Sequence, residues 1–328
     1  MRFVFTFLAV NVLLFLIWCA IVFGQVGGAT KSSQWVFDAY EKKSAIAKSI
    51  KEKKIIIVAG SNALFGIDSK MLSKAFDQPV VNYGVNAGVL LPYTLYKAKE
   101  VISKGDTVLI PLEYPMYNYK GMPNSQMIDY IFARDFEAFY SLTIKEQFHM
   151  LWDITITRVY DGYKAGESKA VTAGLYGAHN IDEFGDQKNT KLKDRSDWLK
   201  NELNSLEANH YGKDFDKSSL GFEYLKEFVS WCENKGAKCV FTPSTLMYFE
   251  TYKTNKVERY FYENLADTVR SFGWEFVGIP YEYMYNKEFY YNTDYHLGDG
   301  ARRTRTQKMI FDLKQADILG LKPTKEPL

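Results

Sequence analysis

Short apolar segments that alternate with helical patterns restrict the fold of this chain more than any other feature. Ile55–Ala59 is a continuous apolar run, typical of a strand that is buried on both faces. Similar strand patterns cover 80–83, 107–112, 238–242 and 275–279. Helical patterns cover 69–76, 92–103, 220–234, 257–272 and the segment after Gly298. Because strand–helix alternation builds right-handed βαβ units, we expect an α/β fold with a parallel sheet.

The alternation stops between Pro115 and about Lys217. Helical patterns at 125–140 and 143–160 are followed there by a loop region rich in Gly, Asn and Asp. The α/β pattern then resumes. We therefore interpret residues 115–217 as an insertion (hereafter, the insertion) within one domain that covers 54–328.

The amino-terminal segment carries no charged residue from Phe3 to Gly24. As a helix it would be about 33 Å long, enough to cross a bilayer. The apolar core of a cleaved signal peptide has only about 7–15 residues, although Gly27-Gly28-Ala29 also fits a weak cleavage site. We predict an uncleaved single-pass anchor in residues 1–30 and a partly helical linker in 31–53.

Charge alone does not decide the orientation of this anchor. Arg2 favours an amino terminus inside the cell, whereas Lys31, Lys42 and Lys43 after the span weaken the bias. We expect the domain to lie outside the cytoplasm.

The composition excludes several classes of function. Lys and Arg total 41 and Asp and Glu total 39, with no long basic run, so nucleic acid is not expected as a partner. Three cysteines without a CxxC pair exclude a disulfide-rich scaffold and a paired-cysteine zinc site. Cys232 and Cys239 either pair in an oxidising compartment or serve as small apolar residues. We expect no metal and no cofactor. With four histidines, a histidine-dependent mechanism must use His149, His179, His210 or His296.

Three segments have residues suited to acyl-transfer chemistry. Ser61 follows the first strand, where ligands bind in open α/β sheets, and it is either a nucleophile or a helix cap. Asn82 to Gly88 after the second strand offers two glycines and the amides of Asn82 and Asn86, which suit an oxyanion hole or an ordinary turn. Asp294 stands two residues before His296 ahead of the last helix, so it can orient the imidazole.

These segments together carry a family resemblance. Gly60-Ser61-Asn62, Asn82-Tyr83-Gly84 and Asp294-Tyr295-His296, in this order, resemble the SGNH (GDSL-like) hydrolase superfamily. The segment from Asp294 to Ala301 is closer to its membrane-anchored branch, whose proteins acylate alginate, peptidoglycan or teichoic acid beside a membrane-bound O-acyltransferase. The resemblance covers 54–114 and 220–312. It implies a three-layer, flavodoxin-like fold.

The resemblance also implies roles for individual residues. Ser61 would be the nucleophile, His296 the general base, Asp294 its orienting acid and Gly84 an oxyanion donor. The superfamily's usual third block, Gly-x-Asn-Asp, is absent, and Glu113 stands about where it belongs. An ionised Glu113 cannot donate, so Asn86 or Asn118 would have to replace the missing donor. Glu113 would instead bind a basic or hydroxyl group near the site or pair with an arginine.

Tyrosines gather in the carboxyl-terminal part of the chain. They suit contact with sugar rings near His296, Tyr295 among them, or packing of a loop-rich surface. The residues are Tyr248, Tyr252, Tyr260, Tyr262, Tyr281, Tyr283, Tyr285, Tyr290, Tyr291 and Tyr295.

The predicted function follows from this resemblance. We expect an O-acyltransferase, most simply an O-acetyltransferase, in the bacterial cytoplasmic membrane with its domain on the periplasmic or extracellular side. Its partners would be a polysaccharide acceptor and a multi-spanning O-acyltransferase that supplies the acyl group. An esterase that removes such groups and a non-catalytic glycan-binding or scaffolding subunit are the alternatives.

Overall fold

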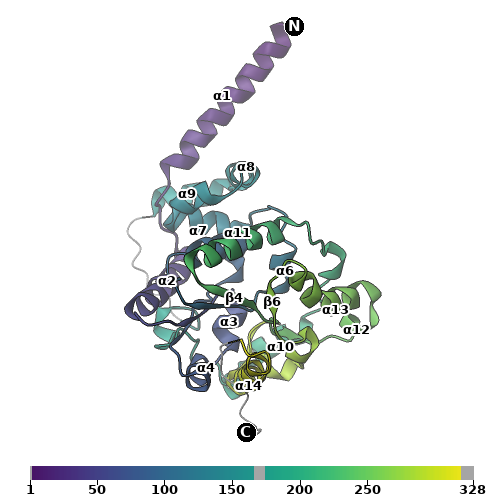
Figure 1. Ribbon diagram of the computed structural model, residues 1–328. Coiled ribbons are helices and arrows are strands. Elements are labelled where there is room, and N and C mark those ends of the chain that lie inside the picture. Colours follow the sequence, from purple (N-terminus) through teal and green to yellow (C-terminus); the bar gives the residue numbers. More distant parts are fainter. Residues whose placement is uncertain (1, 166–173, 319–328) are drawn as a thin grey trace.

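The computed structural model describes residues 2–165 and 174–318 (Figure 1). Its centre is a five-stranded parallel sheet in the order β2-β1-β3-β4-β6. The strands are β1 (Ile55–Ile57), β2 (Val80–Asn82), β3 (Thr107–Ile110), β4 (Lys238–Phe241) and β6 (Glu275–Phe276). The expected α/β class with a parallel sheet is confirmed, and each strand is shorter than its sequence pattern.

The sheet is buried on both faces, which explains its continuous apolar runs. Ile56, Val58 and Val108 belong to a large core on one face, whereas Ile55, Ile57 and Leu109 belong to a second core on the other. Neighbouring side chains of a strand point to opposite faces, so both sets must be apolar.

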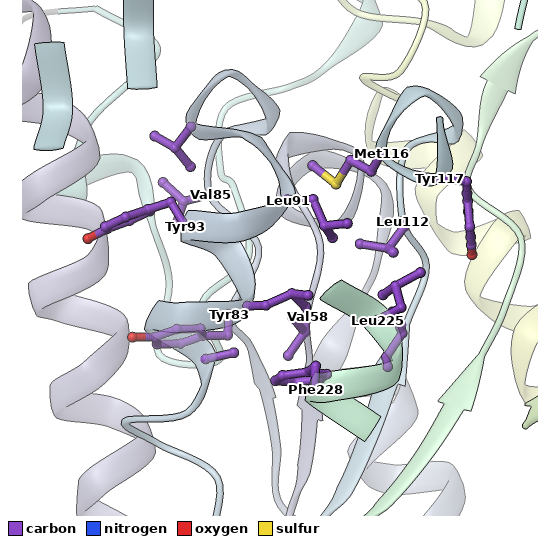
Figure 2. Packing of buried hydrophobic residues seen from close by; sticks show 14 of the residues in the cluster. Val58, Tyr83, Val85, Leu91, Tyr93, Leu112, Met116, Tyr117, Leu225 and Phe228 are labelled. Carbon is purple, nitrogen blue, oxygen red and sulfur yellow. The ribbon is translucent and has the colours of Figure 1, made fainter. Parts of the chain in front are cut away.

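The helices that contribute to the larger core include α2 (Lys31–Ser49), α5 (Leu90–Ala98), α7 (Ser125–Arg134) and α11 (Leu220–Lys235). Figure 2 shows the rings of Tyr83 and Tyr93 pointing towards α2, where the Tyr83 hydroxyl lies 2.8 Å from Ser44 Oγ. Val36 and Tyr40 of α2 are buried. Helix α2, which lies within the expected partly helical linker 31–53, therefore packs against the body.

The second core lies under α3 (Ser61–Gly66), α4 (Ser69–Phe76) and α14 (Asp299–Gln315). The predicted start of α4 is confirmed, because the Asp68 carboxylate accepts the Met71 N–H at 2.9 Å. Such a cap satisfies one of the free N–H groups at a helix start.

The insertion is helical at its beginning. Its helices are α6 (Tyr114–Tyr117), α7, α8 (Ile144–Asp153), α9 (Ile156–Lys164) and α10 (Asp197–Ser205). The 143–160 pattern forms two helices rather than one, because Thr155 has an extended backbone and caps α9 with its side chain. The 125–140 pattern continues past α7 as a 3-10 helix, η2 (Phe136–Ser141).

The remaining elements complete the body. They are α12 (Thr251–Thr254), α13 (Lys256–Arg270), the parallel pair β5 (Leu246–Met247) and β7 (Met284–Tyr285), and the 3-10 helices η1 (Ala87–Val89), η3 (Ala178–Asn180), η4 (Leu192–Asp194), η5 (Gly212–Asp214), η6 (Pro280–Tyr283) and η7 (Lys287–Phe289).

Helix α1 (Arg2–Gly24) extends away from the body (Figure 1). Within residues 2–165 and 174–318 it is the one helix long and apolar enough to cross a membrane, and only 6% of its most apolar window is buried. This agrees with a single-pass anchor.

Candidate functional site

The loops after the first three strands meet at one edge of the sheet. Ile57 pairs with both Asn82 and Leu109, so β1, β2 and β3 end side by side. The loops pack so closely that Gly60 and Gly84 must lack side chains. A Cβ on Gly60 would lie 2.6 Å from the Ala87 nitrogen and from Glu113 Oε1, and one on Gly84 would lie 2.6 Å from the Gly60 oxygen.

Ser61 and His296 both neighbour Phe65, Ser61 along helix α3 and His296 by ring stacking. Ser61 is the first residue of α3 and is partly exposed. Phe65 lies one turn later on the same face, and helical side chains lean towards the amino terminus. The His296 ring stacks on Phe65 with centroids 3.9 Å apart and planes 3° apart. His296 thus lies against the face of α3 that carries Ser61, although no hydrogen bond joins the two side chains in the described structure.

Asn292 orients the imidazole. Its Oδ1 lies 2.8 Å from His296 Nδ1, and its Nδ2 donates to the Tyr176 hydroxyl at 2.8 Å. Since the amide nitrogen is used by Tyr176, the amide oxygen faces the ring and Nδ1 carries the proton. Nε2 has no hydrogen-bond partner among the described residues. It is also not one of the fully buried polar atoms, so part of its surface is accessible. Burial lowers the pKa of His296 to about 3, so the ring is neutral near pH 7.

Asp294 does not contact His296 as the resemblance implies. Its carboxylate accepts the Asn209 amide at 2.6 Å, and burial raises the pKa of Asp294. The loop turns between the two residues, with the His296 N–H donating to the Thr293 carbonyl at 3.4 Å. The partner of Nδ1 is therefore Asn292, and Asp294 connects the loop to the insertion instead.

Glu113 caps the start of α3. Its side chain is 1% exposed, and its Oε2 and Oε1 accept the N–H groups of Gly60 and Asn62 at 3.0 and 2.9 Å. A carboxylate is favourable there because free N–H groups and the helix dipole attract negative charge. Among the described residues Glu113 forms no hydrogen bond with an arginine, the partner that was one of the two predicted for it. The carboxylate occupies part of the place where an anionic ligand would bind.

Arg305 of α14 contacts the same turn. It is fully buried and donates to the Asn62 carbonyl and to Asn62 Oδ1, both at 2.9 Å, and to the Pro243 carbonyl at 3.4 Å. Gly66 leaves room for the guanidinium. Burial lowers the pKa of Arg305. This role of Arg305 could not be predicted, because an arginine in a charged helix is ordinarily exposed.

The predicted oxyanion donors are mostly engaged. The Asn82 amide donates to the Ala63 carbonyl at 2.7 Å, and Asn82 Oδ1 accepts the Gly84 N–H at 3.1 Å. The Asn118 amide donates to the Tyr211 carbonyl at 2.8 Å. Asn86 is different. Its Oδ1 accepts the Gly88 N–H at 2.8 Å, whereas its amide has no partner among the described residues.

Two buried charges support the loop after β2. Lys43 of α2 is fully buried and donates to the Gly84 carbonyl, and burial lowers the pKa of Lys43 to about 7. Asp186 of the insertion accepts the Ser69 hydroxyl at 2.7 Å and the Asn82 amide at 2.8 Å. Burial raises the pKa of Asp186 to about 6. Helix α2 and the insertion thus both hold this loop.

Many of the clustered tyrosines are core residues. Tyr252, Tyr262, Tyr283 and Tyr290 are fully buried. The Tyr295 hydroxyl donates to the Tyr211 hydroxyl at 3.0 Å and is thereby directed into the protein. The packing interpretation holds for these residues.

An open pocket of about 400 Å³ lies beside β5 and includes Met247, Tyr248, Phe249 and Glu250.

Cys232 and Cys239 are free and buried, as expected for small apolar residues. Residues 2–165 and 174–318 contain no group of three or more His, Cys, Asp or Glu side chains placed to hold a metal ion.

The sequence did not identify Asn292 and Phe65 as site residues, although each lies four residues from a predicted catalytic residue. It also did not identify Tyr176, for which it carries no signal. Comparisons with known protein families, curated proteins and solved structures found no match.

Proposed function

We propose that this chain is a membrane-anchored serine acyltransferase of the SGNH type that transfers an acyl group, most simply acetyl, to an extracytoplasmic polysaccharide. The stacking of His296 on Phe65, one helical turn after Ser61, is the observation that carries the proposal. The strand order also supports it, because β2-β1-β3-β4-β6 corresponds to the flavodoxin-like order of a three-layer fold.

Ser61 and His296 would act as nucleophile and base. Nε2 takes the hydroxyl proton as Ser61 Oγ attacks the acyl carbonyl carbon, and it returns the proton to the leaving oxygen as the carbon–oxygen bond breaks. A sugar hydroxyl then gives its proton to Nε2 and attacks the acyl-serine carbon, and Nε2 passes that proton to Ser61 Oγ as the acyl–serine bond breaks. Asn292 holds the required tautomer, the role that asparagine has in Cys-His-Asn sites. A rotation of Ser61 or a small movement of the ring must first bring the two groups into contact.

The oxyanion would be stabilised by the Ser61 N–H and the Asn86 amide. Neither group has a hydrogen-bond partner among the described residues. Asn86 immediately precedes Ala87, whose nitrogen packs against Gly60. Asn86 is therefore a better substitute than Asn118 for the third-block asparagine. Each such donor lowers the barrier by about 3–4 kcal/mol in a working oxyanion hole.

The partners follow from the anchor and the chemistry. Helix α1 would keep the domain at a membrane, where a multi-spanning O-acyltransferase could pass on the acyl group. The pocket beside β5 is a candidate for the acceptor glycan, since Tyr248 and Phe249 offer aromatic faces. An esterase would use the same acyl-enzyme, with water in place of the sugar.

One observation favours a non-catalytic glycan-binding or scaffolding subunit. The Glu113 carboxylate accepts the Gly60 and Asn62 N–H groups, so a second negative charge next to it would be repelled. This arrangement suits a subunit that keeps the fold without turnover.

The deciding experiment tests Ser61 directly. Purified full-length protein is incubated with an activated aryl acetate, and its intact mass is measured for wild type, Ser61→Ala and the exposed control Ser205→Ala. We expect one added acetyl group in wild type and in the control, and none in Ser61→Ala. Labelling that ignores Ser61 would support the non-catalytic subunit. In cells, glycan acylation should fall in Ser61→Ala, whereas an increase would identify an esterase.

A further inference from the structure

Exposed apolar side chains concentrate on one helical pair of the body. Outside α1, fifteen large apolar side chains of the described residues are exposed, and seven of them lie between residues 140 and 163. A soluble surface carries such residues singly, and a contiguous group marks a site of contact with a protein or a membrane. The seven are Tyr140, Ile144, Phe148, Trp152, Ile156, Tyr160 and Tyr163.

The spacing of these residues forms an outward stripe on each helix. Ile144, Phe148 and Trp152 follow an i, i+4, i+8 pattern on α8, and Ile156 and Tyr160 are four residues apart on α9. Their exposed fractions run from 50% for Phe148 to 86% for Ile144. A surface helix of a soluble domain ordinarily directs polar residues outwards, whereas this pair exposes an apolar stripe among its polar residues.

The inward face of α8 is fixed to the body. The exposure of the outward stripe therefore does not come from an undocked helix. Glu146 is fully buried and accepts the hydroxyls of Tyr119, at 2.6 Å, and Tyr224. Glu146 also closes a capping box with Thr143.

The pair is also attached to the anchor. The Trp18 indole N–H donates to the Leu151 carbonyl at 2.8 Å, and the rings of Phe15 and Phe148 lie 6.0 Å apart. The Tyr163 hydroxyl donates to the Ile21 carbonyl at 2.8 Å. Helices α8 and α9 thus lie beside the carboxyl-terminal part of α1 (Figure 1).

The length of α1 then sets the depth of α8, if α1 is taken as the span. Its 23 residues give about 34 Å, and a hydrocarbon core needs about 30 Å, so nearly the whole helix must be immersed. Phe15 is nine residues before Gly24, or about 13 Å along the axis from that end. Phe148, which faces Phe15, must therefore enter the acyl-chain region with it.

We infer that α8 and α9 form a monotopic platform whose apolar stripes are immersed in the leaflet at which α1 ends. The partner of this surface is lipid, because aromatic and aliphatic side chains beside a span suit the headgroup–acyl boundary. The platform fixes the height of the domain above the bilayer. It holds whether or not Ser61 is catalytic, and its test uses no activity.

Collision accessibility of nitroxide labels tests the platform. Full-length protein with Cys19→Ala carries one new cysteine at Ile144 or Ile156, which are 86% and 77% exposed and hence dispensable for packing. Leu13→Cys in α1 is the reference for lipid, and Val257→Cys on α13 is the reference for water. Cys232 and Cys239 are buried, and a Cys19→Ala sample without a new cysteine measures how much label these two residues take up.

The labelled protein is placed alone in phosphatidylcholine–phosphatidylglycerol nanodiscs, and power saturation is measured with oxygen and with a nickel chelate. We expect labels at 144 and 156 to match Leu13, with a high oxygen-to-nickel collision ratio. A ratio matching that of Val257 would overturn the platform and leave a surface for a membrane-protein partner. Protection from both reagents would also overturn it, because it would indicate a contact between copies of this chain.

Discussion

Replacement of Glu113 tests how the start of α3 is held at the sheet edge. Its two oxygens accept the Gly60 and Asn62 N–H groups at 3.0 and 2.9 Å in a site that is 1% exposed. Glu113→Gln keeps one oxygen and turns an amide NH₂ towards the other N–H. One buried donor then lacks a partner, which costs about 1–3 kcal/mol. Glu113→Ala leaves both donors unpaired and should cost about 2–6 kcal/mol.

The free energy of unfolding is measured by denaturant titration of the full-length protein in detergent micelles. Glu227→Gln is the matched control, because Glu227 is exposed and makes no hydrogen bond in the described structure; we expect a change within about 0.5 kcal/mol. The order of stability should be control, then Gln, then Ala. If Glu113→Ala unfolds at the same denaturant concentration as the control, the carboxylate does not hold α3.

Two further predictions concern pH. Burial lowers the pKa of Lys43 from 10.5 to about 7, so between these values the unfolded state binds more protons and the stability of the wild type should rise with pH. Lys43→Met should lose this rise, as measured by unfolding at pH 7 and about pH 9.5; equal slopes would contradict the burial of an unpaired lysine. If the serine is active, kcat/KM for an aryl acetate should stay flat through pH 6.5, because burial lowers the pKa of His296 to about 3. An acid limb near pH 6.5 would assign the base to another group.

The sheet was predictable because each strand is specified locally. Ile55–Ala59 is an apolar run between Lys54 and Gly60, and Val108–Ile110 is one between Thr107 and Pro111; burial on both faces allows few other solutions. The parallel pair β5 and β7 was not predicted, since strands of two residues carry no period. The break between α8 and α9 depends on the backbone of Thr155, and an apolar pattern does not report it.

The site was predictable only as a set of segments. His296 stacks on Phe65, one helical turn after Ser61, so the two segments predicted from strand and helix ends share one neighbour. The partner of the ring was not predictable, because a four-residue loop segment can present either Asn292 or Asp294, and contacts with Tyr176 and Asn209 of the insertion decide between them. Those contacts join residues more than eighty positions apart.

The residues on either side of Ser61 explain how the site is kept rigid. Glu113 accepts the N–H groups of Gly60 and Asn62. Arg305 donates to the backbone carbonyl and to the side-chain oxygen of Asn62. The carboxylate accepts backbone N–H groups and the guanidinium donates to carbonyl and amide oxygens, while Arg305 Nε has no partner among the described residues. These contacts therefore constrain the backbone on both sides of Ser61, which is what the nucleophile role proposed for Ser61 would require.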